Sequence, residues 1–233
     1  MNTDNQLPRH IDRDGLYNTI VKLSIESDYS SRYLLNHVMS QLNMKGSDFS
    51  GFVPVNDPKS PEHGKVHFYA ANEKYRIEVS DGIFSFNIVS GYRGWDEYRR
   101  LLAITLTAMI SLISIQEISV RYISALEDES VFKNLDGIII LNHLPNFSGT
   151  EFRFSCNITD KPIKSAIGKV NLIDSKIIGQ RTVSFVDITT EGKPIGTTFN
   201  DWMEGLDCLH FHEKNLFFLL MNDHFIEKRN PRY

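Results

Sequence analysis

Apolar side chains alternate with polar ones from Tyr17 to Ile25, which is the period of a β-strand with one face toward a core. From Leu34 to Leu42 the apolar positions recur every three to four residues instead, so the pattern there predicts a helix. Ser30 precedes this segment as a capping residue, and Gly46 follows it as a helix terminator. The pattern therefore predicts a strand followed by a helix.

Short strands are expected next, and then a long apolar helix. Asp81-Gly82 is a strong signal for a two-residue hairpin turn between two of these strands. The strands are expected at 49–55, 66–71, 75–80 and 83–90. After a turn at Gly91–Trp95, the segment from Tyr98 to Ile113 is apolar on most of its helical circumference. Such a helix needs cover on more than one side, so it is expected to lie centrally.

A second series of elements follows in a similar order. A strand from Ile118 to Ile123 precedes a short helix predicted from Glu127 to Leu135. Further strands are expected at 137–144, 150–158, 163–173 and 177–188, with a turn at Asp174-Ser175. A Gly/Pro loop at 191–196 precedes a final helix from Asp201 to Ile226.

These patterns predict an α+β fold, with mainly antiparallel sheets packed on two long apolar helices. The connections are too short for crossover helices, which favours antiparallel pairing. We expect a flexible N-terminal segment at 1–16 and two similar halves, 17–115 and 116–228, that share a core or form one continuous domain. The repeated order of elements suggests an internal duplication, although no residue-level repeat accompanies it.

Composition excludes several classes of protein. The 233 residues are 41% hydrophobic and 11% aromatic, with a net charge of −4. These values exclude a disordered chain and a disulfide scaffold, and the lack of basic excess argues against a nucleic-acid partner.

The apolar run Leu101–Ile115 is shorter than the ~18–20 residues that a spanning helix needs. Residues 1–15 are polar and show no secretory signal, so we expect a cytoplasmic protein without a membrane partner, with Cys156 and Cys208 as free thiols.

The final helix carries the richest group of polar side chains. Glu204, Cys208 and His212 are spaced i, i+4, i+8 and would share one helix face, which makes them candidate metal ligands. No CxxC pair or HExxH spacing supports them, so we expect no metal and no cofactor. Asp207 and His210, three residues apart, would be the acid–base pair if the protein is an enzyme. The absence of any catalytic motif favours a protein without enzymatic activity.

Two further groups are candidate binding residues. Arg121 and Tyr122 combine a basic and an aromatic side chain, but neighbouring strand positions face opposite sides. Arg121 is therefore expected to pair with a carboxylate, either Glu151 or Asp187. Arg93, between Gly91 and Gly94, would suit an anion at the start of the long helix, yet a tight turn with Trp95 packed beneath it is the favoured interpretation.

Arg121-Tyr122-Ile123 in mid-chain, and Leu206-Asp207 with His210 near the C-terminus, resemble the motifs of a sporadically distributed family of uncharacterised bacterial proteins. Ser124 stands where that family has Asn. The resemblance implies Arg121, Tyr122, Asp207 and His210 as residues of interest, and the patchy distribution is typical of accessory genes. It implies no reaction.

The sequence leaves a favoured function and two alternatives. The first is a non-enzymatic module of a bacterial accessory system, such as phage defence or toxin–antitoxin, that binds another protein from the same operon or forms a homo-oligomer. The alternative is a small-molecule-binding or hydrolytic protein with an aromatic-lined cavity between the sheet and the C-terminal helix. The residues expected to bind are Trp95, Arg121, Tyr122 and His210. Single-stranded nucleic-acid binding is a third and less favoured option.

Overall fold

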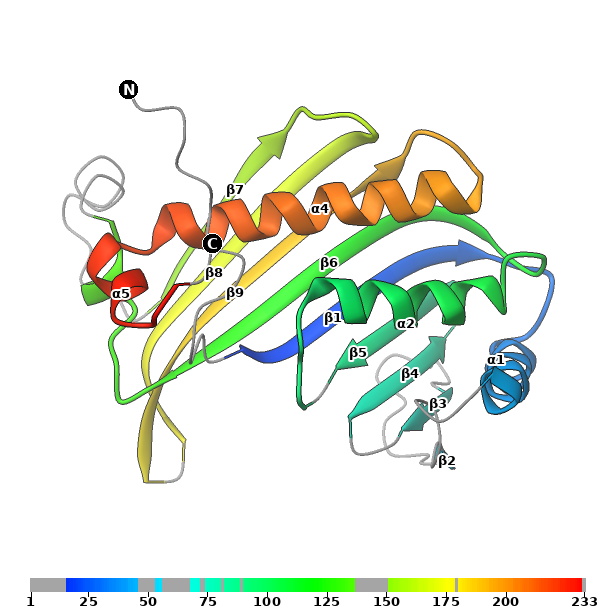
Figure 1. Cartoon of the computed structure of the whole chain (residues 1–233), viewed down its shortest axis with the longest axis horizontal. Helices are drawn as coiled ribbons and strands as arrows, with labels where there is room; N and C mark the ends of the chain where they lie inside the picture. Colours follow the sequence, from blue (N-terminus) through cyan, green and yellow to red (C-terminus); the bar gives the residue numbers. More distant parts are fainter. Residues whose placement is uncertain are drawn as a thin grey trace.

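The computed structural model describes residues 16–45, 53–55, 68–71, 74–80, 82–88, 90–136, 151–178 and 180–231. Its fold is α+β, as predicted, and the described strands form a single sheet (Figure 1). The strands are β1 (Leu16–Glu26), β2 (Val53–Val55), β3 (Phe68–Ala71), β4 (Tyr75–Ser80), β5 (Ile83–Ile88), β6 (Ser114–Glu127), β7 (Glu151–Ile158), β8 (Ile163–Ile178) and β9 (Arg181–Pro194). The helices are α1 (Ser31–Lys45), α2 (Trp95–Thr107), α4 (Phe199–Leu220) and α5 (Asp223–Glu227), with a 3₁₀ turn η3 (Phe132–Asn134).

The sheet is antiparallel throughout and has the order β2-β3-β4-β5-β1-β6-β9-β8-β7. β1 and β6 lie side by side at its centre, with Val21 opposite Val120. β4 and β5 form the hairpin that Asp81-Gly82 predicts, and Gly82 has the positive φ of 72° that the turn requires. The predicted boundary between two halves, at 115–116, falls inside β6, and the division into halves stays a prediction.

The helices cover one face of the sheet with a shared core. The side chains of Val21 and Leu23 on β1 pack in one cluster with Leu101 of α2 and Leu209 of α4. At the centre of this cluster the hydroxyl of Tyr98 accepts a hydrogen bond from the backbone N–H of Val21 and donates one to the carbonyl of Phe86. Side chains of β1, α2 and α4 thus share one core, and a second cluster lies around Leu220 and Phe225; the internal duplication stays a prediction.

The opposite face of the sheet is polar. Lys22 of β1 and Arg121 of β6 lie on it, as does Lys169 of β8, and these residues line an open depression of about 550 Å³. Their strand neighbours Val21 and Val120 point to the helix side and are fully buried. This alternation is why the same strands can build both a core and an open polar surface.

Several predicted boundaries are wrong, among them that of the long helix, which ends at Thr107 rather than at Ile113. The helix expected at 127–135 is replaced by the end of β6 and a 3₁₀ turn, because Asp174 accepts hydrogen bonds from Ser130 and from the N–H of Val131. The turn expected at Asp174-Ser175 is a register irregularity inside β8, which continues to Ile178. The loop expected at 191–196 begins later, because β9 pairs with β8 as far as Pro194.

The final helix is also interrupted. α4 ends at Leu220 because Met221 adopts an extended conformation and forms a bridge with Leu135. Asn222 then caps α5 by accepting a hydrogen bond from Phe225 N at 2.8 Å. The strand expected at 137–144 lies outside the described residues. Within the described ranges, every helix is too short or too polar to cross a bilayer.

Candidate functional site

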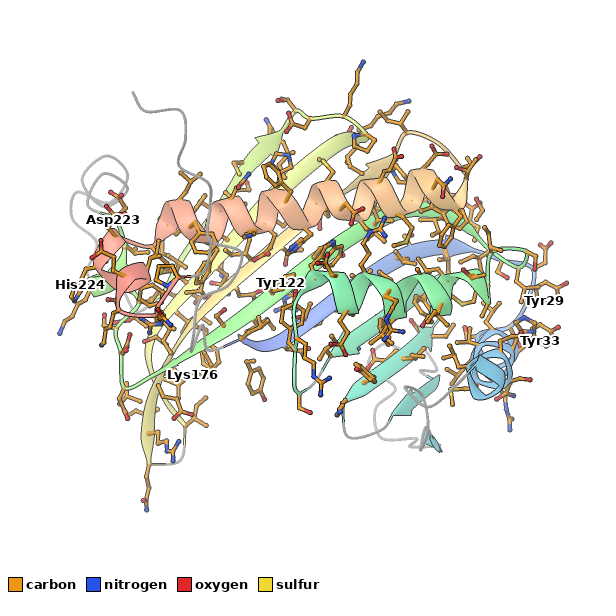
Figure 2. The ribbon with its side chains drawn as sticks, in the orientation of Figure 1. Tyr29, Tyr33, Tyr122, Lys176, Asp223 and His224 are labelled. Carbon is orange, nitrogen blue, oxygen red and sulfur yellow. The ribbon has the colours of Figure 1, made fainter. Side chains whose placement is uncertain are left out.

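A cavity of about 460 Å³ lies between β6, the second half of α4 and the first turn of α2. Its floor includes Tyr122 and Ser124 of β6, both largely buried. Figure 2 labels Tyr122 beside the start of α2 and below α4. The predicted cavity between sheet and C-terminal helix is therefore present, and Tyr122 lies in it.

Local sequence explains how each wall reaches the cavity. Gly91 and Gly94, with φ of 69° and 109°, turn the chain from β5 into α2 and bring Tyr92 and Trp95 to the cavity rim. On α4, residues three or four apart share a face, so His210, Glu213 and Phe217 all border the cavity. Thr198 starts α4 with a capping box that includes Asp201.

The cavity wall is an aromatic cluster built around His210. The imidazole stacks on the indole of Trp95, with ring centroids 4.3 Å apart and planes 15° apart. Tyr122 lies on another side of the imidazole, at 5.5 Å between centroids. The hydroxyls of Tyr92 and Tyr122 are hydrogen-bonded at 2.7 Å. The ring of His210 is thus held in one orientation by its neighbours, without a close hydrogen bond to its Nδ1.

The surroundings keep His210 uncharged. Burial, and then the positive charge of Lys214, lower the pKa of His210 from 6.5 to about 3. Its Nδ1 lies 3.8 Å from Oε2 of Glu213, which is too long for a strong hydrogen bond. Nδ1 is enclosed, and the imidazole as a whole lines the cavity. Near neutral pH the site therefore presents a neutral imidazole.

The floor of the cavity combines an acid with neutral hydroxyls. The side chain of Glu213 is only 6% exposed. Burial, followed by the charges of Tyr92 and Glu213, raises the pKa of Tyr122 well above its usual value. Tyr122 and His210 thus stay neutral near pH 7, and the largely buried Glu213 lies beside them in the cavity lining.

Asp207 has a different role from the one that its spacing suggested. Its carboxylate accepts hydrogen bonds from Trp95 Nε1 and Arg99 Nε, each at 2.8 Å. The carboxylate that contacts His210 belongs to Glu213 instead. Asp207 therefore joins α4 to α2 and fixes the indole on which His210 stacks.

The other predicted binding residue, Arg121, lies on the opposite face of the sheet. It donates two hydrogen bonds to Asp187, at 2.8 Å and 2.7 Å, as one of the two predicted pairings requires. These bonds raise the pKa of Arg121. Of the four residues expected to bind, Trp95, Tyr122 and His210 are brought together, and Arg121 is separated from them by the sheet.

The candidate metal ligands do not converge. Glu204 is exposed, Cys208 Sγ lies 3.9 Å from the carbonyl of Lys161, and His212 Nε2 lies 2.9 Å from Asp160. In the part of the chain that the structure describes, no three His, Cys, Asp or Glu side chains are grouped as metal ligands would be. Cys208 and Cys156 are free thiols, as predicted, and burial raises the pKa of Cys208, with the charge of Asp160 adding to the effect.

Sequence reasoning missed several cavity residues, among them Tyr92, Ser124, Glu213 and Phe217. The side-chain spacing of a strand and of a helix would have predicted two of them as neighbours of Tyr122 and His210. Ser124 follows Tyr122 by two positions and so shares its strand face, and Glu213 follows His210 by three and so shares its helix face.

No protein-family model matches the chain, and a search of curated proteins finds no match. The resemblance to a sporadic bacterial family therefore stays a prediction.

Proposed function

We propose that the protein binds a small organic molecule in the cavity between β6, α4 and the start of α2. The observation that carries this proposal is the cavity itself. Its volume of about 460 Å³ is within the usual range for ligand sites of ~300–1,000 Å³. Its aromatic wall and few polar groups, His210 and Glu213 among them, are typical of such sites.

The electrostatics of His210 favour binding over hydrolysis. A general base works best with a pKa near the working pH, whereas that of His210 is about 3. Asp207, the partner expected for an acid–base pair, is already engaged by Trp95 and Arg99. A neutral imidazole that lines the cavity suits a hydrogen bond to a ligand.

Tryptophan fluorescence provides the test. Trp95 borders the cavity, whereas Trp202, the other tryptophan of the chain, is 3% exposed in the core. A library of small polar aromatic compounds should contain members that change the fluorescence of Trp95 and raise the melting temperature. The fluorescence change should be absent in Trp95→Phe.

A matched pair of variants locates the binding. Ser124→Phe places a ring on the cavity floor, whereas Ser119→Phe places one on the opposite face of the same strand. Compounds should lose binding to Ser124→Phe and keep it to Ser119→Phe. If Ser124→Phe does not fold, Phe217→Ala on the half-buried wall is the substitute, with weaker binding expected. A library with no binding compound, or equal binding to Ser124→Phe, would overturn the proposal.

The first function expected from the sequence, partner binding in a phage-defence or toxin–antitoxin system, stays a prediction. One observation favours a protein partner: Phe211 and Leu219 on the outer side of α4 are 55% and 66% exposed. Co-purification with proteins of the same operon tests it, with Phe211→Ser and Leu219→Ser expected to reduce the capture. Unchanged capture by both variants would contradict a role for α4.

A further inference from the structure

The buried side chain of Ser124 lines the cavity with its hydroxyl unpaired. Ser124 lies on β6 and is only 5% exposed. Within the described part of the chain, its side chain takes part in none of the hydrogen bonds. A buried hydroxyl without a partner is costly, and folded proteins leave few of them. The place of Ser124 in the cavity lining therefore points to a hydrogen bond with a bound molecule.

Ser124 shares its strand face with Tyr122. The two residues are two positions apart on β6, and both line the cavity. The hydroxyl of Tyr122 is already hydrogen-bonded to that of Tyr92 at 2.7 Å, whereas the hydroxyl of Ser124 is not engaged. Ser124 is therefore the hydroxyl of this strand face that a ligand would use.

The aromatic rings around the cavity suit a flat apolar body. Tyr122 belongs to β6, Trp95 to the start of α2, and Phe217 and Phe218 to α4. Aromatic rings offer broad apolar surfaces and prefer offset-stacked or edge-on contacts with other rings. Because these four rings come from three elements around one space, a flat ligand would be contacted from more than one side.

Two side chains of the lining show how this space acts on charge. Burial is the main cause that lowers the pKa of His210 to about 3, so a positive charge is disfavoured at the imidazole. Burial is also the main cause that raises the pKa of Tyr122 well above its usual value, so a negative charge is disfavoured at the phenol. A charged group seated against these two rings would lose its hydration in the same way.

The charged side chains of the described lining do not favour one sign either. Two are basic and two are acidic: Arg93 and Lys214, and Asp96 and Glu213. The described lining therefore has no excess of charge that would attract an ion of either sign to the aromatic wall.

Together, these features define a ligand class. We infer, on the basis of the proposed function, that the cavity takes an uncharged, flat aromatic molecule whose polar group hydrogen-bonds to Ser124. The ring of this molecule lies among the aromatic side chains. A molecule of the same shape without a polar group leaves the hydroxyl of Ser124 unpaired, and unpaired buried groups of this kind give a binding site its selectivity.

Four probes that share one bicyclic ring system test this inference. Indole is uncharged and has an N–H donor, indene lacks that donor, tryptamine is a cation, and indole-3-acetate is an anion. Calorimetry with the full chain should show indole binding about fivefold more tightly than indene, because indole alone of these two can donate to Ser124. Tryptamine and indole-3-acetate should each bind at least about tenfold more weakly than indole, because their charges lose hydration. A charged probe that binds as tightly as indole would overturn the inference.

A matched pair of variants assigns the hydrogen bond. Ser124→Ala removes the hydroxyl and should reduce the preference for indole over indene to less than about twofold. Ser119→Ala, on the opposite face of the same strand, should keep the preference of the wild type. If Ser124→Ala does not fold, Ser124→Cys takes its place with the same expectation, because a thiol is a much weaker hydrogen-bonding group. An unchanged preference for indole in the Ser124 variant contradicts the inference.

The outcome is separable from that of the proposed function. If library compounds bind in the cavity but indole does not, the ligand class is wrong and the cavity is still a binding site. If no compound binds in the cavity, the proposed function fails as well.

Discussion

Asp207 of α4 accepts a hydrogen bond from Trp95 Nε1 of α2 at 2.8 Å, and Arg99 Nε of the same helix donates to the same carboxylate. This contact joins the two long helices beside the cavity. It also fixes the indole that stacks on His210, with centroids 4.3 Å apart. The carboxylate that the sequence offered as a catalytic acid thus holds an indole that forms part of the cavity wall.

Removing that carboxylate should weaken both the fold and the site. A hydrogen bond to a charged acceptor contributes about 1.5 kcal/mol, and a half-exposed ion pair adds less than about 1 kcal/mol. We therefore expect Asp207→Ala to lower the free energy of unfolding by about 2 kcal/mol in urea titrations. Glu204→Ala, at an exposed position of the same helix, is the control and should change it little. If Asp207→Ala costs the same in a Trp95→Phe background, the indole bond has no role.

The low pKa of His210 predicts a loss of stability in acid. The unfolded chain takes up a proton at this residue below pH 6.5, but the folded chain does so only near pH 3. The free energy of unfolding should therefore fall as the pH drops from 6.5 to 3, by up to about 1.4 kcal/mol per pH unit from this residue. Glu213, Lys214 and Tyr122 also face the ring of His210. The wild type and a His210→Phe variant share all three residues, so a difference between these two proteins reports on His210 itself.

A comparison of the wild type with His210→Phe isolates this effect, because the phenyl ring can still stack on the indole of Trp95 but cannot take up a proton. Its unfolding free energy, measured by urea titration at several pH values, should vary less steeply between pH 6.5 and 3. His224→Phe changes an exposed histidine of α5 and should keep the wild-type slope. Parallel curves for the wild type and His210→Phe would contradict the lowered pKa.

The fold was predictable where local pattern and tertiary structure agree. β1 and the β4–β5 hairpin follow directly from alternation and from Asp81-Gly82. The errors occur where a distant partner decides the local conformation. Asp174 binds the segment after β6, and Leu135 pairs with Met221, so the helix expected at 127–135 does not form and α4 ends early. Such pairings are not encoded in local periodicity.

The site was predictable in part for a related reason. Trp95, Tyr122 and His210 are conspicuous residue types, and the structure brings all three together. The role of Asp207 was not predictable, because its neighbours on α4 are visible in the sequence and its partners on α2 are not. Which carboxylate contacts His210 depends on the angle between α2 and α4, and only the fold determines that angle.

Close packing of α4 on the sheet depends on Gly205. A Cβ at this position would lie 2.7 Å from Cδ1 of Ile118 and 2.7 Å from Cδ1 of Ile163. Helix propensity favours alanine over glycine by about 1 kcal/mol, but overpacking costs about 1–3 kcal/mol. We expect Gly205→Ala to lower the melting temperature. Ile163→Val removes one of the two methyl groups, so Gly205→Ala should cost less in that background, and an equal cost would contradict the proposed overlap.

Helix α5 should depend on one partly buried ion pair. Arg229 Nη2 lies 2.7 Å from Glu129, and the guanidinium carbon lies 3.5 Å from the ring centroid of Phe225. Burial acts to raise the pKa of Glu129, but Arg229 and Lys228 together hold it below the usual value. The side chain of Arg229 is 8% exposed, whereas that of Lys228 is 62% exposed.

This difference in burial predicts different costs for two similar substitutions. Arg229→Gln should lower the free energy of unfolding by about 1.5–3 kcal/mol, because it removes a charged hydrogen bond from a largely buried guanidinium to Glu129. Lys228→Gln removes a surface contact to the same carboxylate and should cost less than about 1 kcal/mol. Hydrogen exchange should show faster exchange in α5 for Arg229→Gln alone. Equal effects of the two variants would mean that burial of Arg229 does not strengthen its pairing with Glu129.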